Sequence, residues 1–293
     1  MTAPALTLPL TRSQPRPFSR ARLAGAIGAV VVLTVIVVVA FGDGVAPYRA
    51  TELSGESLEA PGPAHLLGTN LLGQDVASQL ILGARSSLVV ALVAGIGTVL
   101  LGGLIGVAAG WFRGSVDGTL MRVTDLVLVL PKLPLLLLVG TMAGGSGLTL
   151  AVLIAAIFWP VSARVLRAQV LTLRSGVHIR AATGFGAGPW HQLRRHILPA
   201  LALLAVAEFI PAASRAVALL AGLAFLGIGD PTEPSWGAMM RDAVAYRGLF
   251  VTAAWTWWLV PPIAAVVILV VGITLLGVGA EQRLNPRLSR HQK

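Results

Sequence analysis

Residues 22–41 read RLAGAIGAVVVLTVIVVVAF, and no charged side chain follows Arg22 in this stretch. A helix of about 20 residues, rising about 1.5 Å per residue, crosses a hydrocarbon core of about 30 Å. A cleaved signal peptide would have a shorter apolar section that ends at a small-residue cleavage site. This section is longer and ends in Phe41-Gly42-Asp43. The stretch therefore predicts a retained membrane-spanning helix.

Five later segments are also apolar and long enough to cross a bilayer. They cover residues 86–110, 120–143, 148–171, 198–222 and 252–280. A backbone in lipid must satisfy its own hydrogen bonds, so each segment is predicted to be helical. The composition agrees, because 12% of the residues are charged, against about 25% in an ordinary soluble domain. We therefore expect an all-α membrane protein with about six transmembrane helices.

Polar segments divide the chain around these helices. Residues 1–21 are rich in proline and arginine and are predicted to be a disordered N-terminal tail. Residues 42–85 contain five of the twelve acidic residues and are predicted to be a loop in water. Residues 86–282 would form a transmembrane core of five helices, interrupted by a polar loop at 172–199. Residues 283–293 are predicted to be a second tail.

Arginine and lysine set the predicted orientation, because positive side chains near span ends remain in the cytoplasm. They lie before the first span, between the second and third, in the loop at 172–199 and after the last span. Both termini and that loop are therefore expected in the cytoplasm, and the loop at 42–85 outside. The net charge of +10 comes from these flanking residues. The expected partner is thus the lipid bilayer and not nucleic acid.

No pattern typical of a catalytic or cofactor site is present. The sequence has no cysteine, no His-Glu-x-x-His, no Gly-x-Ser-x-Gly and no phosphate-binding Gly-x-x-x-x-Gly-Lys-Ser/Thr loop. His65 and Asp75 alone make an incomplete metal site, so a structural role is predicted for them. We expect no catalytic residue, no metal ligand and no ATP hydrolysis by this chain itself.

Three ionisable residues inside predicted spans are candidates for lining a path through the membrane: Lys132, Glu208 and Arg215. Glu208 and Arg215 lie seven residues apart, which puts them on nearly one helix face. An internal ion pair that fills a packing gap is the alternative interpretation. Asp125 is expected to pair with Arg122 near the membrane surface.

Glycine, proline and tryptophan in the spans suggest how the helices pack. Gly102 and Gly106 form a small-xxx-small pattern, which predicts close contact with another helix of this chain or of a partner. Four prolines are predicted to bend or interrupt spans: Pro131, Pro134, Pro160 and Pro211. Three tryptophans are expected to form an interfacial belt: Trp255, Trp257 and Trp258.

The polar loop at residues 175–199 has a helical pattern of its own. Residues 177–185 can form a short helix, and residues 186–188 include glycines that allow a tight turn. Pro189 can occupy the first position of a second helix. The loop is therefore predicted to be a compact knob of two short helices outside the membrane.

This loop resembles the EAA loop of binding-protein-dependent ABC importer permeases, whose pattern is Glu-Ala-Ala, three residues, Gly, nine residues, Ile, one residue and Leu-Pro. The matching residues are Ala181, Ala182, Gly186, Leu198 and Pro199. Arg180 replaces the family's glutamate, and His196 its isoleucine, with Ile197 one place later. The resemblance implies that residues 175–199 couple an ATPase subunit to the spans. Arg180 implies either weaker coupling or a matched ATPase surface.

Further blocks resemble the dipeptide, oligopeptide and nickel branch of these permeases. Residues 65–76, HLLGTNLLGQDV, are similar to the branch's His-x-Leu-Gly-Thr-Asp-x-x-Gly-Arg-Asp, with Asn70 and Gln74 in place of Asp and Arg. Residues 223–239 and the sequence LNPR at 284–287 are similar to later blocks of the branch.

The resemblance implies a type I ABC importer permease fold in the cell membrane of a bacterium. The implied partners are a homologous second permease, two nucleotide-binding ATPase subunits that hold ATP and magnesium, and an extracytoplasmic solute-binding protein. The cargo would be di- or oligopeptides, or a related small solute such as a nickel chelate. The alternative is a secondary transporter driven by a proton gradient, with Glu208 carrying the proton.

Overall fold

The computed structural model describes residues 17–284, and the regular elements in that range are helices. They are α1 (Pro17–Val45), α2 (Val76–Phe112), α3 (Gly114–Val129), α4 (Lys132–Met142), α5 (Gly147–Arg174), α6 (Val177–Gly184), α7 (Pro189–Gln192), η1 (Leu193–Ile197), α8 (Leu198–Phe225), α9 (Trp236–Ala245), η2 (Trp255–Leu259) and α10 (Val260–Leu284). The predicted all-α class is confirmed. Of the predicted tails, residues 1–16 and 285–293 lie outside the described residues, while residues 17–21 belong to α1.

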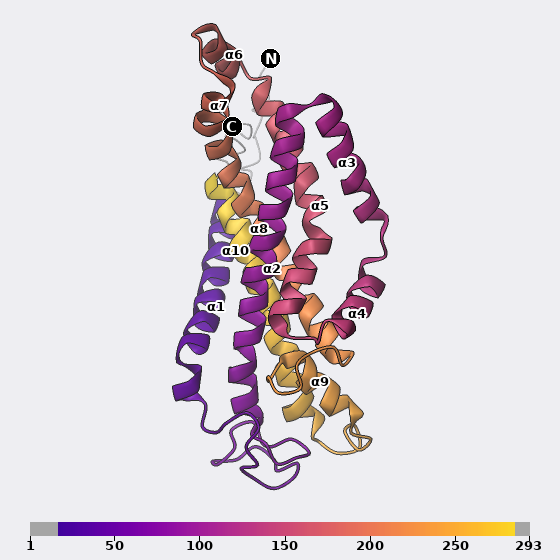
Figure 1. The fold of residues 1–293 in the computed structure, drawn as a ribbon. Helices are drawn as coiled ribbons and strands as arrows, with labels where there is room; N and C mark the ends of the chain where they lie inside the picture. Colours follow the sequence, from indigo (N-terminus) through magenta and orange to yellow (C-terminus); the bar gives the residue numbers. More distant parts are fainter. Residues whose placement is uncertain (1–16, 285–293) are drawn as a thin grey trace, which may run out of the picture.

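The helices form one elongated bundle (Figure 1). Five of its helical segments are long and apolar enough to cross a membrane alone: α1, α2, α5, α7 with η1 and α8, and η2 with α10. The bent pair of α3 and α4 passes the same test only when taken together. In Figure 1, α3 begins at the end that carries α6 and α7, which we call the knob end, and α4 finishes at the opposite end. Counted as one broken span, the pair gives six candidate spans, the number that the sequence predicts.

The predicted third span, residues 120–143, is broken into α3 and α4, which are bent by 84°. Leu130 and Pro131 connect them with extended backbone angles. A proline ring disfavours the helical conformation of the residue before it, so α3 stops ahead of Pro131, as predicted. The other prolines that were expected to bend or interrupt spans do not interrupt them, because they lie within continuous helices: Pro134, Pro160 and Pro211.

The loop between α1 and α2 covers residues 46–75 and is shorter than the predicted 42–85, because α2 already begins at Val76. Asp75 caps this helix: its Oδ2 atom accepts hydrogen bonds of 2.7 Å from the backbone N–H and the hydroxyl of Ser78. The Oδ1 atom of Asp75 lies 3.0 Å from Nδ1 of His65. Both side chains are buried. His65 and Asp75 therefore have a structural role, as predicted.

The three tryptophans at the start of the last span differ in how far the protein covers them. Trp258 is buried in the main hydrophobic core. The Nε1–H group of Trp257 donates to the carbonyl of Thr69 in the 46–75 loop, at 3.3 Å. Trp255 is exposed. The expected interfacial belt is therefore wrong for Trp258, because the core covers this side chain. For Trp255 and Trp257 it stays a prediction.

Helices α2 and α5 pack closely through glycines. A Cβ atom on Gly102 would lie 2.8 Å from Cβ of Ser162, and one on Gly106 would lie 2.4 Å from the carbonyl oxygen of Ala163. Both distances are shorter than van der Waals contact, so a side chain at either position would push the helices apart. The close helix contact predicted at these two glycines is confirmed, and its partner is a helix of the same chain.

We predict that Gly106→Val lowers the free energy of unfolding by about 1 to 3 kcal/mol, because the new side chain must displace the backbone of α5. The measurement is the thermal denaturation of the purified protein in nanodiscs. Gly103→Val is the matched control, since a Cβ atom there would lie 3.6 Å from Cδ1 of Leu166, an ordinary contact. An equal loss of stability in both variants would contradict this account of the α2–α5 contact.

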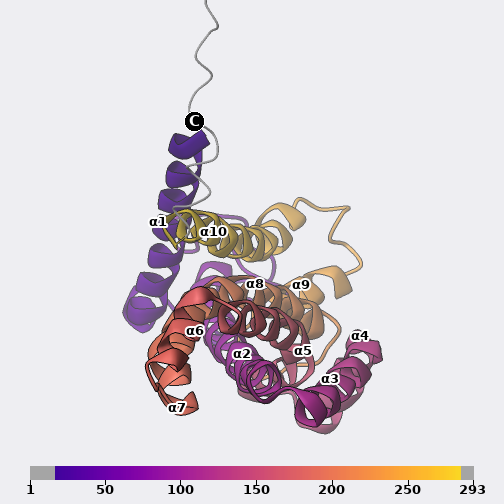
Figure 2. The ribbon, with the colours of Figure 1, turned by 90° about the horizontal axis from the view of Figure 1, so that it is seen from above.

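Helix α1 lies at the edge of the bundle and packs mainly on α10 (Figure 2). A Cβ atom on Gly25 would lie 2.6 Å from Cα of Gly279, so the two backbones nearly touch. On its other faces α1 exposes apolar side chains, including those of Leu23, Val30 and Leu33. The first and last spans thus form a pair beside the rest of the core.

Candidate functional site

The knob has the local structure that its sequence predicted. The first short helix, α6, covers Val177–Gly184, and Pro189 occupies the first position of α7. Between them, Gly186 has a φ of +83°, in the left-handed region that favours glycine. In Figure 1 both helices lie at one end of the bundle, where α6 is outermost and α7 leads into α8.

The knob is joined to the spans by a small apolar cluster, which we call the linkage cluster. Its buried members are Trp111, Leu166, Val170, Ile179, Ile197 and Leu201. These residues come from α2, α5, α6, η1 and α8. Ile179 is the contribution of α6, and its side chain is 3% exposed. A displacement of α6 must therefore move the ends of three spans or break this packing.

Two polar side chains that the sequence analysis missed stiffen the same region. The side-chain amide of Gln192 is buried and donates to Oγ1 of Thr183 at 3.0 Å and to the carbonyl of Ala187 at 2.8 Å. It thereby ties α6 and the turn to α7. Arg174, at the end of α5, donates to the carbonyl of Trp111 and lies 5.0 Å from the centre of that indole ring. No sequence motif marks Gln192 or Arg174. Their hydrogen-bond partners are either several residues or more away along the chain or are backbone carbonyl groups, which no side-chain pattern reveals.

The sequence-predicted coupling residues lie mostly on the exposed face of this region. Arg180 and Ala181 are exposed on α6, and Ala182 is half-buried. Leu198 and Pro199 are exposed in the first turn of α8. The tip also carries apolar side chains that no packing explains: that of Phe185 is 92% exposed and that of Trp190 69% exposed. Exposed large apolar groups of this kind are typical of a surface that binds another protein.

The connection from the knob to α8 is a wide helical turn. In η1 the N–H group of Leu198 donates to the carbonyl of Leu193, five residues earlier. Pro199 has no N–H to offer the preceding turn, which favours such irregular hydrogen bonding. Ile197 is fully buried in the linkage cluster, and His196 is half-buried. Ile197 lies one position after the isoleucine of the family pattern, and it is thus the residue that packs in the linkage cluster.

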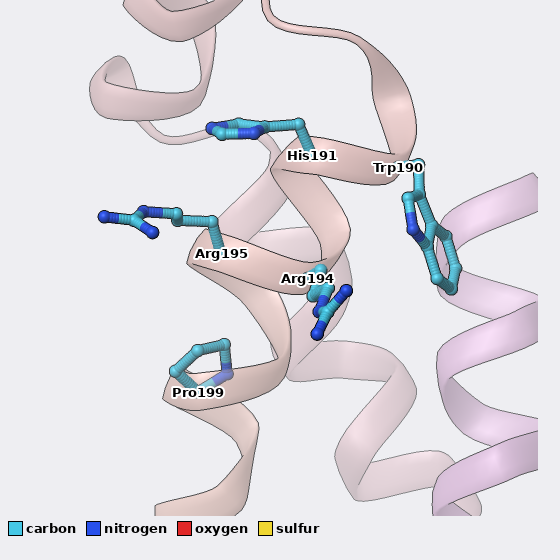
Figure 3. A pocket seen from close by; sticks show the side chains of 5 residues that line it. All are labelled: Trp190, His191, Arg194, Arg195 and Pro199. Atoms are coloured by element: carbon cyan, nitrogen blue, oxygen red, sulfur yellow. The ribbon is translucent and has the colours of Figure 1, made fainter.

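A groove of about 590 Å³ runs beside this turn. Its lining residues are Trp190, His191, Arg194, Arg195 and Pro199. Figure 3 shows His191, Arg195 and Pro199 on one side of the helical column and Trp190 on the other. Within residues 17–284 neither arginine forms an ion pair. The groove therefore presents positive charge, which suits an acidic surface or another anionic group.

The ionisable residues of the spans are arranged differently from the predicted pairs. The ammonium of Lys132 lies 4.8 Å from the ring centre of Phe158, and the guanidinium of Arg215 lies 5.2 Å from the same centre. Glu208 instead accepts a hydrogen bond of 3.1 Å from the hydroxyl of Ser162. Within residues 17–284 Glu208 and Arg215 form no ion pair, so the packing interpretation of this pair is wrong.

The ion pairs near the knob end also differ from the prediction. Asp125 pairs with Arg164 of α5 at 2.5 Å and not with Arg122. Asp117, in the first turn of α3, accepts two hydrogen bonds from Arg167, of 2.6 and 2.7 Å. Both pairs join α3 to α5. The predicted partner of Asp125 was the nearest arginine in the sequence, whereas the true partner comes from the neighbouring helix.

The loop at 46–75 explains two departures from the family pattern. Asn70 and Gln74 replace an acidic and a basic residue, and in the structure the amide of Asn70 donates to Oε1 of Gln74 at 2.8 Å. The two departing residues are thus hydrogen-bonded to each other without any charge. In the part of the chain from 17 to 284, no three histidine, aspartate or glutamate side chains gather as a metal site would require.

Comparison with known proteins connects this architecture to transport. Residues 102–290 match the family described as binding-protein-dependent transport system inner membrane component. The glutathione transport system permease protein GsiD of Pectobacterium atrosepticum is 31% identical over 276 residues, which cover 93% of this chain and 90% of the relative. The oligopeptide transport system permease protein OppC of Mycobacterium bovis is 30% identical over 244 residues, 82% of each chain. The matched range of the family includes α6, α7 and the groove beside η1.

Proposed function

The chain belongs to the family of binding-protein-dependent transport system inner membrane components, and from this premise we propose that it forms one half of the path through which an importer moves short peptides. It is a permease of the peptide branch of ABC importers and a multi-pass protein of the inner membrane. The other half of the path would be a homologous second permease. A related small solute, such as a nickel chelate, is the other cargo that this branch accommodates.

We further propose that two ATPase subunits drive the transport and bind ATP and magnesium, while this chain binds neither. An extracytoplasmic solute-binding protein would deliver the cargo to the 46–75 side of the bundle. This proposal places the knob end, and with it both ends of the chain, in the cytoplasm. The excess of arginine at the knob end supports that orientation, because positive side chains remain on the cytoplasmic side.

The observation that supports the coupling role is the combination of an exposed tip and a buried base. Phe185 and Trp190 offer apolar side chains to a partner, while Ile179 is packed between the ends of α2, α5 and α8. A docking subunit that closes on ATP would push the knob, and the linkage cluster would transmit the movement to those three spans. The spans would then exchange access between the two sides of the membrane, because the docked ATPase favours one of the two states.

Arg180 is proposed to contact an acidic site on the ATPase. Its side chain is exposed on α6, and it forms no ion pair within residues 17–284. The positive groove at Arg194 and Arg195 would contact the same acidic surface. Arg180 would thus form a contact of reversed charge where the family has a glutamate, and the ATPase would supply the matching acidic residue.

The test is reconstitution of the chain in proteoliposomes with its second permease, both ATPase subunits and the binding protein. We expect uptake of a labelled tripeptide to require ATP hydrolysis and to persist when the proton gradient is dissipated. If no ATPase subunit associates with the chain, and uptake follows an imposed proton gradient, the chain is a secondary transporter and the proposal is wrong.

A further inference from the structure

Two positive side chains lie close to one aromatic ring in the membrane-spanning helices, and neither has an acidic partner among the described residues. Lys132 is the first residue of α4, and Arg215 lies in the middle of α8, yet both contact the ring of Phe158 in α5. Within residues 17–284 neither forms an ion pair. Charged groups at this depth are costly, and they persist where they face water or a functional partner.

The break between α3 and α4 is what brings Lys132 to this place. A continuous helix over residues 120–143 would not turn by 84° at Pro131. The bend carries α4 beside α5. Lys132 and Arg215 are both half-buried, so neither side chain is fully enclosed by the core. The ring of Phe158 stabilises each cation, but it cannot neutralise them.

We propose that Lys132 and Arg215 form a docking station for the terminal carboxylate of a short peptide as it crosses the membrane, with Glu208 receiving the amino terminus. The inference rests on the proposed transport of peptides by this chain. A carboxylate has two oxygens that can accept hydrogen bonds from two cations at once, and such charge-assisted bonds are the strong ones.

The position of Glu208 sets the length of cargo that the station fits. Glu208 and Arg215 lie seven residues apart on nearly one face of α8, which is about 10 Å along the helix axis. An extended chain spans at most about 3.3 to 3.6 Å per residue, so the opposite charges of a tripeptide lie about 10 Å apart. Glu208 is also half-buried. Among residues 17–284 its one side-chain partner is the hydroxyl of Ser162, which donates to Oε2 and leaves Oε1 for an ammonium group.

The test compares two cargoes in the reconstituted importer: trialanine with its free carboxylate and trialanine C-terminal amide. We expect the double variant Lys132→Gln with Arg215→Gln to lower the rate of ATP-driven uptake of the free acid by about tenfold or more. Uptake of the amide should change less than about twofold, because it never uses the charge of the station. Lys132→Arg should retain the preference, since it keeps the positive charge.

Arg122→Gln is the control, because Arg122 is an exposed arginine of α3 that contacts neither Phe158 nor Glu208 in the described structure. It should leave the ratio of acid to amide uptake unchanged. If the double variant lowers the uptake of both cargoes equally, the two cations are structural and the station is wrong. If the wild type shows ATP-driven uptake but the ratio of acid to amide uptake is the same in the variants, the proposed docking station is wrong and the proposed function is not affected. If the wild type shows no ATP-driven uptake, the proposed function and the station fail together.

Discussion

Phe185→Glu is expected to lower cargo-stimulated ATP hydrolysis by the assembled importer by about 30-fold or more. The side chain of Phe185 is 92% exposed at the turn between α6 and α7, and no residue from 17 to 284 covers it. A large apolar side chain at the centre of a protein interface commonly contributes about 2 to 4 kcal/mol to binding. A carboxylate in its place would remove that contribution and would also have to be desolvated in the docked complex.

The measurement is peptide-stimulated ATPase activity of the complex in nanodiscs, with copurification of the ATPase subunits as a second readout. Phe250→Glu is the matched control: Phe250 is 71% exposed and lies in the segment after α9, at the end of the bundle opposite the knob (Figure 1). That variant should retain ATPase subunits and stimulation. Normal coupling in Phe185→Glu would mean that the ATPase docks elsewhere on the chain.

Asp75→Ala is expected to lower the free energy of unfolding by about 3 kcal/mol or more. The carboxylate is buried, caps α2 through Ser78 and contacts the buried ring of His65. Loss of a helix cap costs about 0.5 to 2 kcal/mol. A further cost of about 1 to 3 kcal/mol arises for each buried polar group that loses its partner. The two effects act together, because one side chain serves both contacts.

Thermal denaturation in nanodiscs would measure this loss, and Asp43→Ala provides the comparison. Asp43 is exposed near the end of α1, close to the same loop in sequence. Removing its carboxylate should change the stability little. A denaturation midpoint in Asp75→Ala that matches the wild type would show that the 46–75 loop is held by other contacts, such as the bond from Trp257 to Thr69.

Features that depend on neighbouring residues could be predicted from the sequence. Apolar runs predicted the spans, because a backbone in lipid has no alternative to the helix. Gly186 and Pro189 predicted the turn and the second helix of the knob, because each restricts the backbone at its own position. Pro131 predicted an interruption, although not the 84° bend that follows it. In each case the physical cause lies within a few residues of the effect.

Features that depend on packing could not be predicted in this way. Gln192 reads as an ordinary polar residue until the fold brings Thr183 and the carbonyl of Ala187 to its amide. Asp125 was assigned to an arginine three residues away, while its partner Arg164 approaches from another helix. The sequence indicates Lys132 and Arg215 as candidates for lining a path, but only the fold shows that they lie beside one aromatic ring.

The contact between α1 and α10 joins two helices that are synthesised at different times. Gly25 and Gly279 touch in the finished bundle but stand at opposite ends of the chain. A ribosome that adds about 5 to 20 residues per second needs on the order of 10 to 50 seconds to travel from one to the other. During that interval α1 must remain in lipid without its partner, and its lack of charged side chains between residues 23 and 41 allows it to wait there. Helix α10, made much later than α1, is therefore the main helix that holds α1 in place.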